Sequence, residues 1–107
     1  LRDWSSDVCS SDLMLTEGGA KCLGYKDVGK LETGYKADIT LVDREGLHWY
    51  PKNDTLSLMA YSANSMDVDT VLVNGEVLFR HKEFTKLDIE KIKAEAERTR
   101  KKLFAQI

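Results

Sequence analysis

The chain has 107 residues, of which 42% are hydrophobic and 32% are charged, a balance typical of one small globular domain. Its formal net charge of -2 gives no electrostatic reason to expect nucleic acid or an anionic membrane as a partner. There is no apolar run of membrane length and no basic segment followed by an apolar one, so we expect neither a membrane span nor a secretion signal.

The first thirteen residues differ in character from the rest. Asp3 to Leu13 spell DWSSDVCSSDL, which has no helical period and no clean alternation. This stretch resembles the conceptual translation of a common short-read sequencing adapter; the alternative is a natural Ser/Asp-rich disordered leader. We therefore expect residues 1–13 to be a non-native, adapter-like leader without structure, and we exclude them from the fold prediction. Such a junction also means that Met14 need not be a natural start.

The remainder, residues 14–107, has a formal net charge of 0, because one arginine and three aspartates lie in the leader. Cys9 also lies there, so Cys22 is the single cysteine left and cannot form an internal disulfide. This favours a reducing, cytoplasmic location. We expect Cys22 to be a small buried hydrophobe on a helix, and not a nucleophile.

Residues 14–24 (MLTEGGAKCLG) predict a short helix that ends at a glycine. Gly18 and Gly19 inside it each lower helix propensity by about 1 kcal/mol relative to alanine, so this helix should pack closely against another element. The next segment, VGKLETGYKADITLVD (28–43), predicts a turn-rich entry into a strand at 39–43.

Residues 44–54 are expected to form a loop that contains the only proline, Pro51, directly after a His-Trp-Tyr sequence. An apolar spacing of three and four over residues 56–60 then favours one or two helical turns. Either Asp54 or Thr55 would cap these turns, since both side chains can accept a hydrogen bond from the first backbone N–H groups.

Two strand-like runs follow, at 70–74 and 76–80. Asn74-Gly75 lies between them, and this dipeptide is the strongest short-range signal for a β-hairpin, because both central residues of its tight turn need a positive φ. We therefore expect a two-residue hairpin here.

The last predicted element is an amphipathic helix at 88–104, whose apolar face carries Ile89, Ile92, Ala96 and Leu103, with Thr99 filling the gap. Thr85 followed by Asp88 resembles a capping box at its start. Acidic side chains come early in this helix and basic ones late, which matches the helix dipole.

Few side chains in the sequence are candidates for catalysis or metal binding. His48 and His81 are far apart in the sequence, and neither has another ligand at the spacing of a metal site. We expect His48 to be a loop packing residue and His81 a solvated residue at a strand end. Tyr61 and Ser62 have no evident base partner, and a solvated helix face explains the basic run at 98–102. The sequence therefore predicts no catalytic, cofactor-binding or metal-ligating residue in this chain.

Three segments together resemble the C-terminal end of the amidohydrolase superfamily, in its cytosine-deaminase-like branch: MLTEGGAKCLG (14–24), VGKLETGYKADITLVD (28–43) and VDTVLVNGEVLFRHKEF (68–84). The segment HWYPKNDTLSLMAYSANSMDVD (48–69) is similar to the same subgroup. The resemblance is nearest to the 5-methylthioadenosine/S-adenosylhomocysteine deaminases. Guanine deaminases, chlorohydrolases and imidazolone-type hydrolases of the same branch remain alternatives, as does a stand-alone α+β binding module.

The resemblance implies an α+β fragment of a larger enzyme, which has a (β/α)8 barrel and a small β-sandwich built from both chain ends. Residues 14–24 would be the last barrel helix, held close to a barrel strand by its glycines. Residues 25–84 would form the C-terminal part of the composite sandwich, and residues 85–107 the trailing amphipathic helix. The missing partners would be the N-terminal strands and the barrel of the same chain.

The resemblance also implies hydrolysis of a C–N bond in a purine-type small molecule. In this family a divalent metal, zinc or iron, activates water and is held by histidines and an aspartate that all precede residue 14. The chain would then hold no cofactor, would be inactive alone, and would fold poorly or associate through the uncovered strand edges at 39–43, 70–74 and 76–80.

Overall fold

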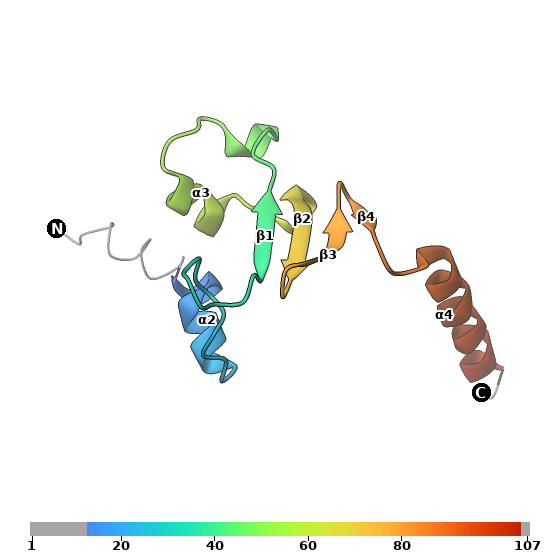
Figure 1. Cartoon of the computed structure of the whole chain (residues 1–107). Coiled ribbons are helices and arrows are strands. Elements are labelled where there is room, and N and C mark those ends of the chain that lie inside the picture. The colour runs from blue at the N-terminus through green and yellow to red at the C-terminus, as the bar shows by residue number, and fades with distance from the viewer. Residues whose placement is uncertain (1–12, 106–107) are drawn as a thin grey trace.

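The computed structural model describes residues 13–105, and Figure 1 shows their arrangement. The predicted leader lies outside the described residues except for Leu13, which is helical together with residues 14 and 15. The elements that follow are α2 (Glu17–Cys22), β1 (Ile39–Val42), η1 (Leu47–Trp49), α3 (Thr55–Tyr61), η2 (Ser65–Asp67), β2 (Val68–Val73), β3 (Glu76–Arg80), β4 (Glu83–Phe84) and α4 (Ile89–Phe104).

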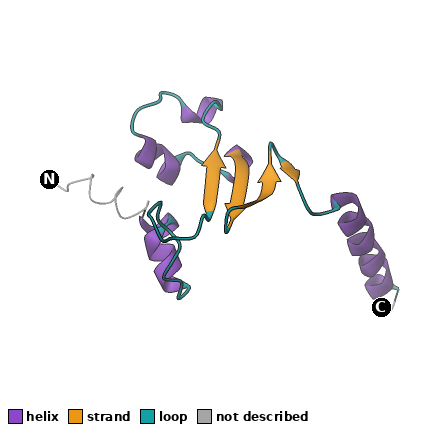
Figure 2. Ribbon diagram, viewed as in Figure 1, coloured by secondary structure: helices purple, strands orange, loops and turns teal. Residues whose placement is uncertain are grey.

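The four strands form one antiparallel sheet in the order β1-β2-β3-β4 (Figure 2). The predicted hairpin between β2 and β3 is confirmed: Asn74 has a φ of 50° and Gly75 a φ of 79°, and Val73 pairs with Glu76 beyond the turn. Both residues therefore have the left-handed backbone that this turn requires. The sheet also contains β4, which sequence patterning missed because two residues are too few to show an alternation.

The segment between β1 and β2 leaves the sheet and returns to it. It contains η1, α3 and η2, which Figure 1 shows grouped near the end of β1, whereas α2 lies near the start of that strand. The side chain of Asp54 caps α3 by accepting a 2.8 Å hydrogen bond from the backbone N–H of Ser57, so Asp54, and not Thr55, is the cap.

The core is small. Trp49 is the one large side chain in residues 13–105 that is fully buried, and most apolar residues of the strands are half-buried. The radius of gyration is 18.5 Å, against about 13 Å for a compact chain of this length. The antiparallel sheet and the separate helices confirm the α+β class, but the apolar faces of this sheet lack much of the cover that a finished domain provides.

The helix predicted at 14–24 is shorter and interrupted. A bend at Thr16 separates the turn at 13–15 from α2. A Cβ atom at Gly18 would lie 2.8 Å from the carbonyl oxygen of Leu13, and one at Gly19 would lie 2.7 Å from that of Met14. Within the described residues the two glycines thus allow a close approach to the preceding turn of their own chain.

The last helix, α4, stands apart from the sheet beyond β4 (Figures 1 and 2). Asp88 is its N-cap and accepts a 3.0 Å hydrogen bond from the backbone N–H of Lys91. The predicted capping role of Thr85 is wrong, because its hydroxyl donates to the carbonyl of Val77 and thereby extends the sheet contacts of that segment. No helix within residues 13–105 has the length and apolar content needed to cross a membrane.

Candidate functional site

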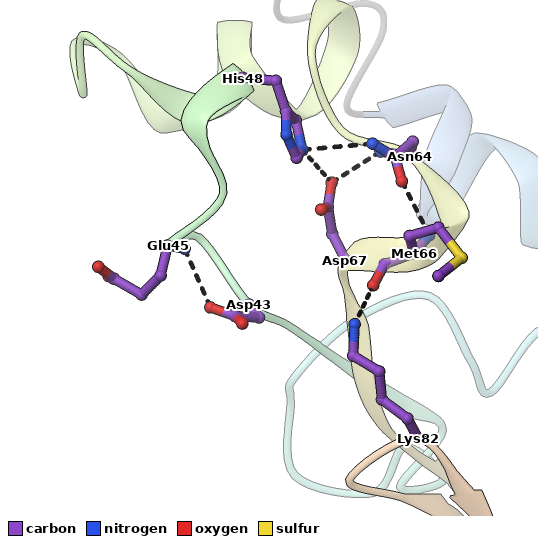
Figure 3. Close-up of polar contacts among 7 residues, drawn as sticks. All are labelled: Asp43, Glu45, His48, Asn64, Met66, Asp67 and Lys82. Carbon is purple, nitrogen blue, oxygen red and sulfur yellow. Dashed lines mark hydrogen bonds and ion pairs between the residues drawn. The ribbon is translucent and has the colours of Figure 1, made fainter.

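The best-defined cluster of polar side chains surrounds Asp67, at the junction of η2 and β2 (Figure 3). Asp67 is 6% exposed, the lowest value for a charged residue in the described part of the chain. A buried carboxylate needs hydrogen-bond donors to replace its hydration. Its donors come from two segments that are distant from each other in the sequence.

One oxygen of Asp67 receives most of these contacts. Its Oδ2 lies 2.8 Å from His48 Nε2, which reaches across from η1, and accepts a 2.9 Å hydrogen bond from the backbone N–H of Asn64. The Asn64 side chain accepts a 2.8 Å hydrogen bond from the backbone N–H of Met66, which completes a capping box around η2. The cluster therefore fixes the start of β2 and the η1 loop in one arrangement.

The geometry also assigns the proton on His48. A carboxylate only accepts, so Nε2 must carry a hydrogen to donate to Asp67. The amide nitrogen of Asn64 lies 3.3 Å from the same Nε2 and is itself a donor, so that longer contact is secondary. The ring lies against Gly46, where a Cβ atom would come within 2.6 Å of His48 Cε1. Gly46 is therefore required for this placement of the ring.

Two opposing effects set the pKa of Asp67. Burial raises it, but the hydrogen bond from His48 and the backbone N–H of Asn64 lower it, and the net pKa lies below the usual value of an aspartate. The carboxylate is therefore ionised at neutral pH and available to hold the imidazole.

Backbone contacts connect the same cluster to the other strands. The carbonyl of Asp67 accepts a 2.7 Å hydrogen bond from the N–H of Asp43, directly after β1. Lys82, in the turn between β3 and β4, donates to the carbonyl of Met66 (Figure 3). Asp67 and its neighbours thus join β1, β2 and the β3–β4 turn, and they close the excursion from 43 to 67.

Trp49 is buried next to this cluster. Its ring is 0% exposed and lies 5.7 Å from the guanidinium carbon of Arg44, within the range of a cation–π contact. Its indole nitrogen makes no hydrogen bond within residues 13–105. The loop that carries His48 therefore supplies both a hydrogen-bond partner of Asp67 and the centre of the apolar core.

The second histidine belongs to a separate contact. His81 Nδ1 lies 3.2 Å from the carboxylate of Asp69, which also accepts a 2.8 Å hydrogen bond from the hydroxyl of Thr70. The side chain of His81 is 73% exposed, so its prediction as a solvated residue is confirmed. The prediction of His48 as a packing residue is incomplete, since it misses the bond to Asp67.

Other predicted residues take ordinary places. Cys22 is exposed, so its prediction as a buried hydrophobe is wrong. The reason is that Ala20 is the buried residue of α2, and a position two residues later lies on the other side of a helix. Tyr61 is exposed at the end of α3. A local signal for the cluster did exist, because Asn64 and Asp67 have the spacing of a capping box.

The contacts around Asp67 hold the η1 loop against the start of β2. The described partners of His48 are a carboxylate and an amide, with no hydroxyl or thiol within its reach that it could activate. Nowhere in residues 13–105 do three or more His, Cys, Asp or Glu side chains gather in a way that could hold a metal ion. The cluster therefore serves the architecture of the sheet.

The sequence model of the amidohydrolase family matches residues 11–78. Two similar relatives are both 5-methylthioadenosine/S-adenosylhomocysteine deaminases. That of Carboxydothermus hydrogenoformans is 46% identical over 96 residues, which are 90% of this chain and 22% of the relative. That of Pelotomaculum thermopropionicum is 48% identical over 85 residues, which are 79% of this chain and 20% of the relative.

Solved structures agree with these matches. An adenosine deaminase from Xanthomonas campestris with bound zinc has a TM-score of 0.79 and 31% identity, over 84% of this chain and 21% of that chain. An atrazine chlorohydrolase from Arthrobacter aurescens complexed with zinc has a TM-score of 0.70 and 33% identity, over 78% and 18% of the respective chains. The chain thus spans about a fifth of the length of the proteins that it matches.

Proposed function

The chain belongs to the amidohydrolase family, and from this premise we propose that it is the C-terminal part of a metal-dependent deaminase. The proposed substrate is 5-methylthioadenosine, S-adenosylhomocysteine or a related purine-type small molecule, and the reaction is hydrolysis of a C–N bond. The observation that carries the proposal is the identity of 46–48% to deaminases of this kind over most of the chain. The solved chlorohydrolase, at 33% identity, supports the branch more than the substrate.

The uncovered surface beside α2 supports the view that more protein packs here. A hollow of about 470 Å³ lies between α2 and the turn after β2. Three apolar side chains on its wall are exposed, namely Leu23 (76%), Tyr25 (57%) and Val73 (44%). Exposed apolar side chains that gather around one hollow are typical of a contact surface.

We propose that the rest of the parent enzyme supplies the cover. In this proposal residues 14–24 are the last barrel helix, interrupted at Thr16, and residues 25–84 are the C-terminal part of a composite β-sandwich. Residues 85–107 are the trailing helix. Among the described residues β1 is an unpaired edge of the sheet. This supports the division, because an edge strand in a finished sheet is usually paired or covered.

The residues from 13 to 105 do not fit a metal site, since no three suitable ligands come together among them. We therefore propose that the zinc or iron of the parent is held entirely by its missing portion. The chain as given should bind no stoichiometric zinc or iron, which elemental analysis after dialysis would check. About one tightly held metal per chain would contradict this proposal.

The deciding experiment is to recover the intact reading frame from the same genome and express its full product. We expect a His-x-His pair upstream of residue 14, together with release of ammonia from 5-methylthioadenosine or S-adenosylhomocysteine. The 107-residue chain, assayed at equal concentration, should release none. Ammonia release from the chain alone would contradict its role as an inactive part, and an intact frame without activity on these substrates would contradict the substrate assignment.

We also propose a cytoplasmic location, because residues 14–107 contain a single cysteine.

A further inference from the structure

The helix α4 carries an apolar seam that is exposed from Ile92 onward, while Ile89 at its start is half-buried. The seam residues recur at alternating intervals of three and four: Ile89, Ile92, Ala96, Thr99 and Leu103. Every residue from 90 to 105 is exposed, including Ile92 at 47% and Leu103 at 60%. This interval pattern is that of the inner positions of a coiled coil, which place one face of a helix against another helix.

The middle of the seam is small and needs no outside hydrogen-bond partner. Ala96 has a single methyl group, and the hydroxyl of Thr99 donates a 2.9 Å hydrogen bond to the carbonyl of Glu95 within the same helix. A second helix can therefore approach closely at the centre of α4 without leaving a buried hydroxyl unsatisfied. The larger Ile92 and Leu103 lie on either side of this centre.

Charged residues on the two flanks of the seam differ in their partners. On one flank, Lys93 is paired with Glu90 at 2.8 Å, and Arg100 is paired with Glu97, with 2.9 Å between Nε and Oε2. On the other flank, the side chains of Glu95 and Lys102 form no ion pair within the described residues. Beside the seam on this flank, Glu95 and Lys102 are thus unpaired charges of opposite sign, and Lys91 and Arg98, farther from the seam, are also unpaired within the described residues.

We propose that α4 is a self-association surface and that its occupant is α4 of a second copy of this chain, packed antiparallel. An antiparallel register that is centred between Ala96 and Thr99 places each of these residues opposite the other in the second copy. The same register places Ile92 opposite Leu103 and brings Glu95 beside Lys102 of the second copy, twice by symmetry. The proposal does not depend on the enzymatic activity of the parent.

The distribution of charge along α4 selects the antiparallel direction. Residues 88–97 carry four acidic and two basic side chains, a net charge of -2, whereas residues 98–104 carry four basic and no acidic ones, a net charge of +4. An antiparallel pair places each basic half beside an acidic half. A parallel pair would place the two basic halves against each other, which is unfavourable.

The test is sedimentation equilibrium of the full 107-residue chain over a wide concentration range at low salt. We expect the mass to rise from that of a monomer toward twice that value. Ile92→Asp should raise the dissociation constant by more than about tenfold, because its charge would lie in the seam twice. Ala94→Asp introduces the same charge two residues away, on the opposite side of the helix, and should leave association unchanged. Circular dichroism would check that both variants keep their helix.

Orientation has its own test. Glu95→Lys should weaken association, and adding Lys102→Glu to that variant should restore it, since the exchanged charges again face each other only in the antiparallel register. A chain that stays monomeric overturns the proposal and leaves the missing portion of the parent as the cover of α4. Equal association of the Ile92→Asp and Ala94→Asp variants also overturns it, because association would then run through the strand edges. Failure of the Lys102→Glu rescue overturns the antiparallel register.

Discussion

The Asp67 cluster and α4 represent two different ways of holding a segment in place. Asp67 is hydrogen-bonded to His48, nineteen positions away in the sequence, and joins two strands through backbone contacts. In α4 the polar side-chain contacts span only three or four residues, as between Glu97 and Arg100. The first region therefore forms or is lost as a unit, whereas the second depends on local helix signals and on a partner outside the described structure.

The largest effect on the Asp67 region, with none expected in α4, should come from removing the side chain of Trp49. Trp49→Ala should lower the free energy of unfolding of the sheet by about 3–5 kcal/mol, as large-to-small substitutions in a core do. That loss is a large part of the 5–15 kcal/mol that stabilises a typical domain. Urea unfolding followed by circular dichroism would measure it, with Tyr50→Ala as a control at an exposed neighbour. Equal effects of the two substitutions would show that the indole is not the centre of this region.

A smaller but still large effect is expected from Asp67→Ala. It removes the acceptor of the N–H of Asn64 and of the His48 ring, at about 0.5–1.5 kcal/mol for each hydrogen bond lost, since both donors are partly exposed to water. Hydrogen exchange should accelerate at β1 and β2 and stay unchanged in α4. Asp43→Ala is the matched control, because it removes only an exposed bond to the N–H of Glu45. Uniform acceleration along the chain would contradict the separation of the two regions.

Acid should weaken the same cluster. The pKa of Asp67 is lowered in the folded state, so its contribution is complete above the ordinary aspartate pKa and is lost as the pH falls through the lower folded value. Unfolding midpoints measured from neutral pH down to strongly acidic pH should fall less steeply in Asp67→Asn than in the original chain. Parallel curves would mean that the carboxylate of Asp67 does not carry this dependence.

The smallest expected effect is confined to α4. Asp88→Ala removes its N-cap and should cost about 1 kcal/mol of helix stability, while hydrogen exchange in the sheet stays unchanged. The matched variant Asp54→Ala removes the equivalent cap of α3, which lies within the excursion between β1 and β2. We expect that variant, but not Asp88→Ala, to change exchange rates at β2.

The sequence predicted the parts whose signals are local. The bounds of β3 at 76–80, the turn at Asn74-Gly75 and the helix ending at Phe104 follow from short-range patterns. The role of His48 was not predictable in this way, because its partner is set by the return of the chain after α3. The exposure of Cys22 was missed for a related reason, since the buried face of a six-residue helix depends on the elements around it.

Local patterns alone did not predict how much of the sheet is covered, whereas the family resemblance implied that its partners are missing. Alternating patterns predicted which runs form strands, but half-buried faces follow from what packs on them, and much of that is absent from the described residues. The expectation of missing partners came from residues 28–43 and 68–84, which resemble amidohydrolases. The family match over 11–78 confirms that resemblance. The chain spans only about a fifth of its relatives. This explains why its helix and strand signals are consistent although its own core is small.

The contact between Asp43 and Asp67 has a consequence for the order in which the chain folds. β2 and β3 are joined by two residues, so their hairpin can form on a timescale of about microseconds. β1 can pair with β2 only after the chain from 43 to 67 has closed on itself, and this closure costs more conformational entropy than the hairpin does. We therefore expect the hairpin to be present in the folding transition state and the docking of β1 to come later, so that substitutions at Asp67 chiefly accelerate unfolding.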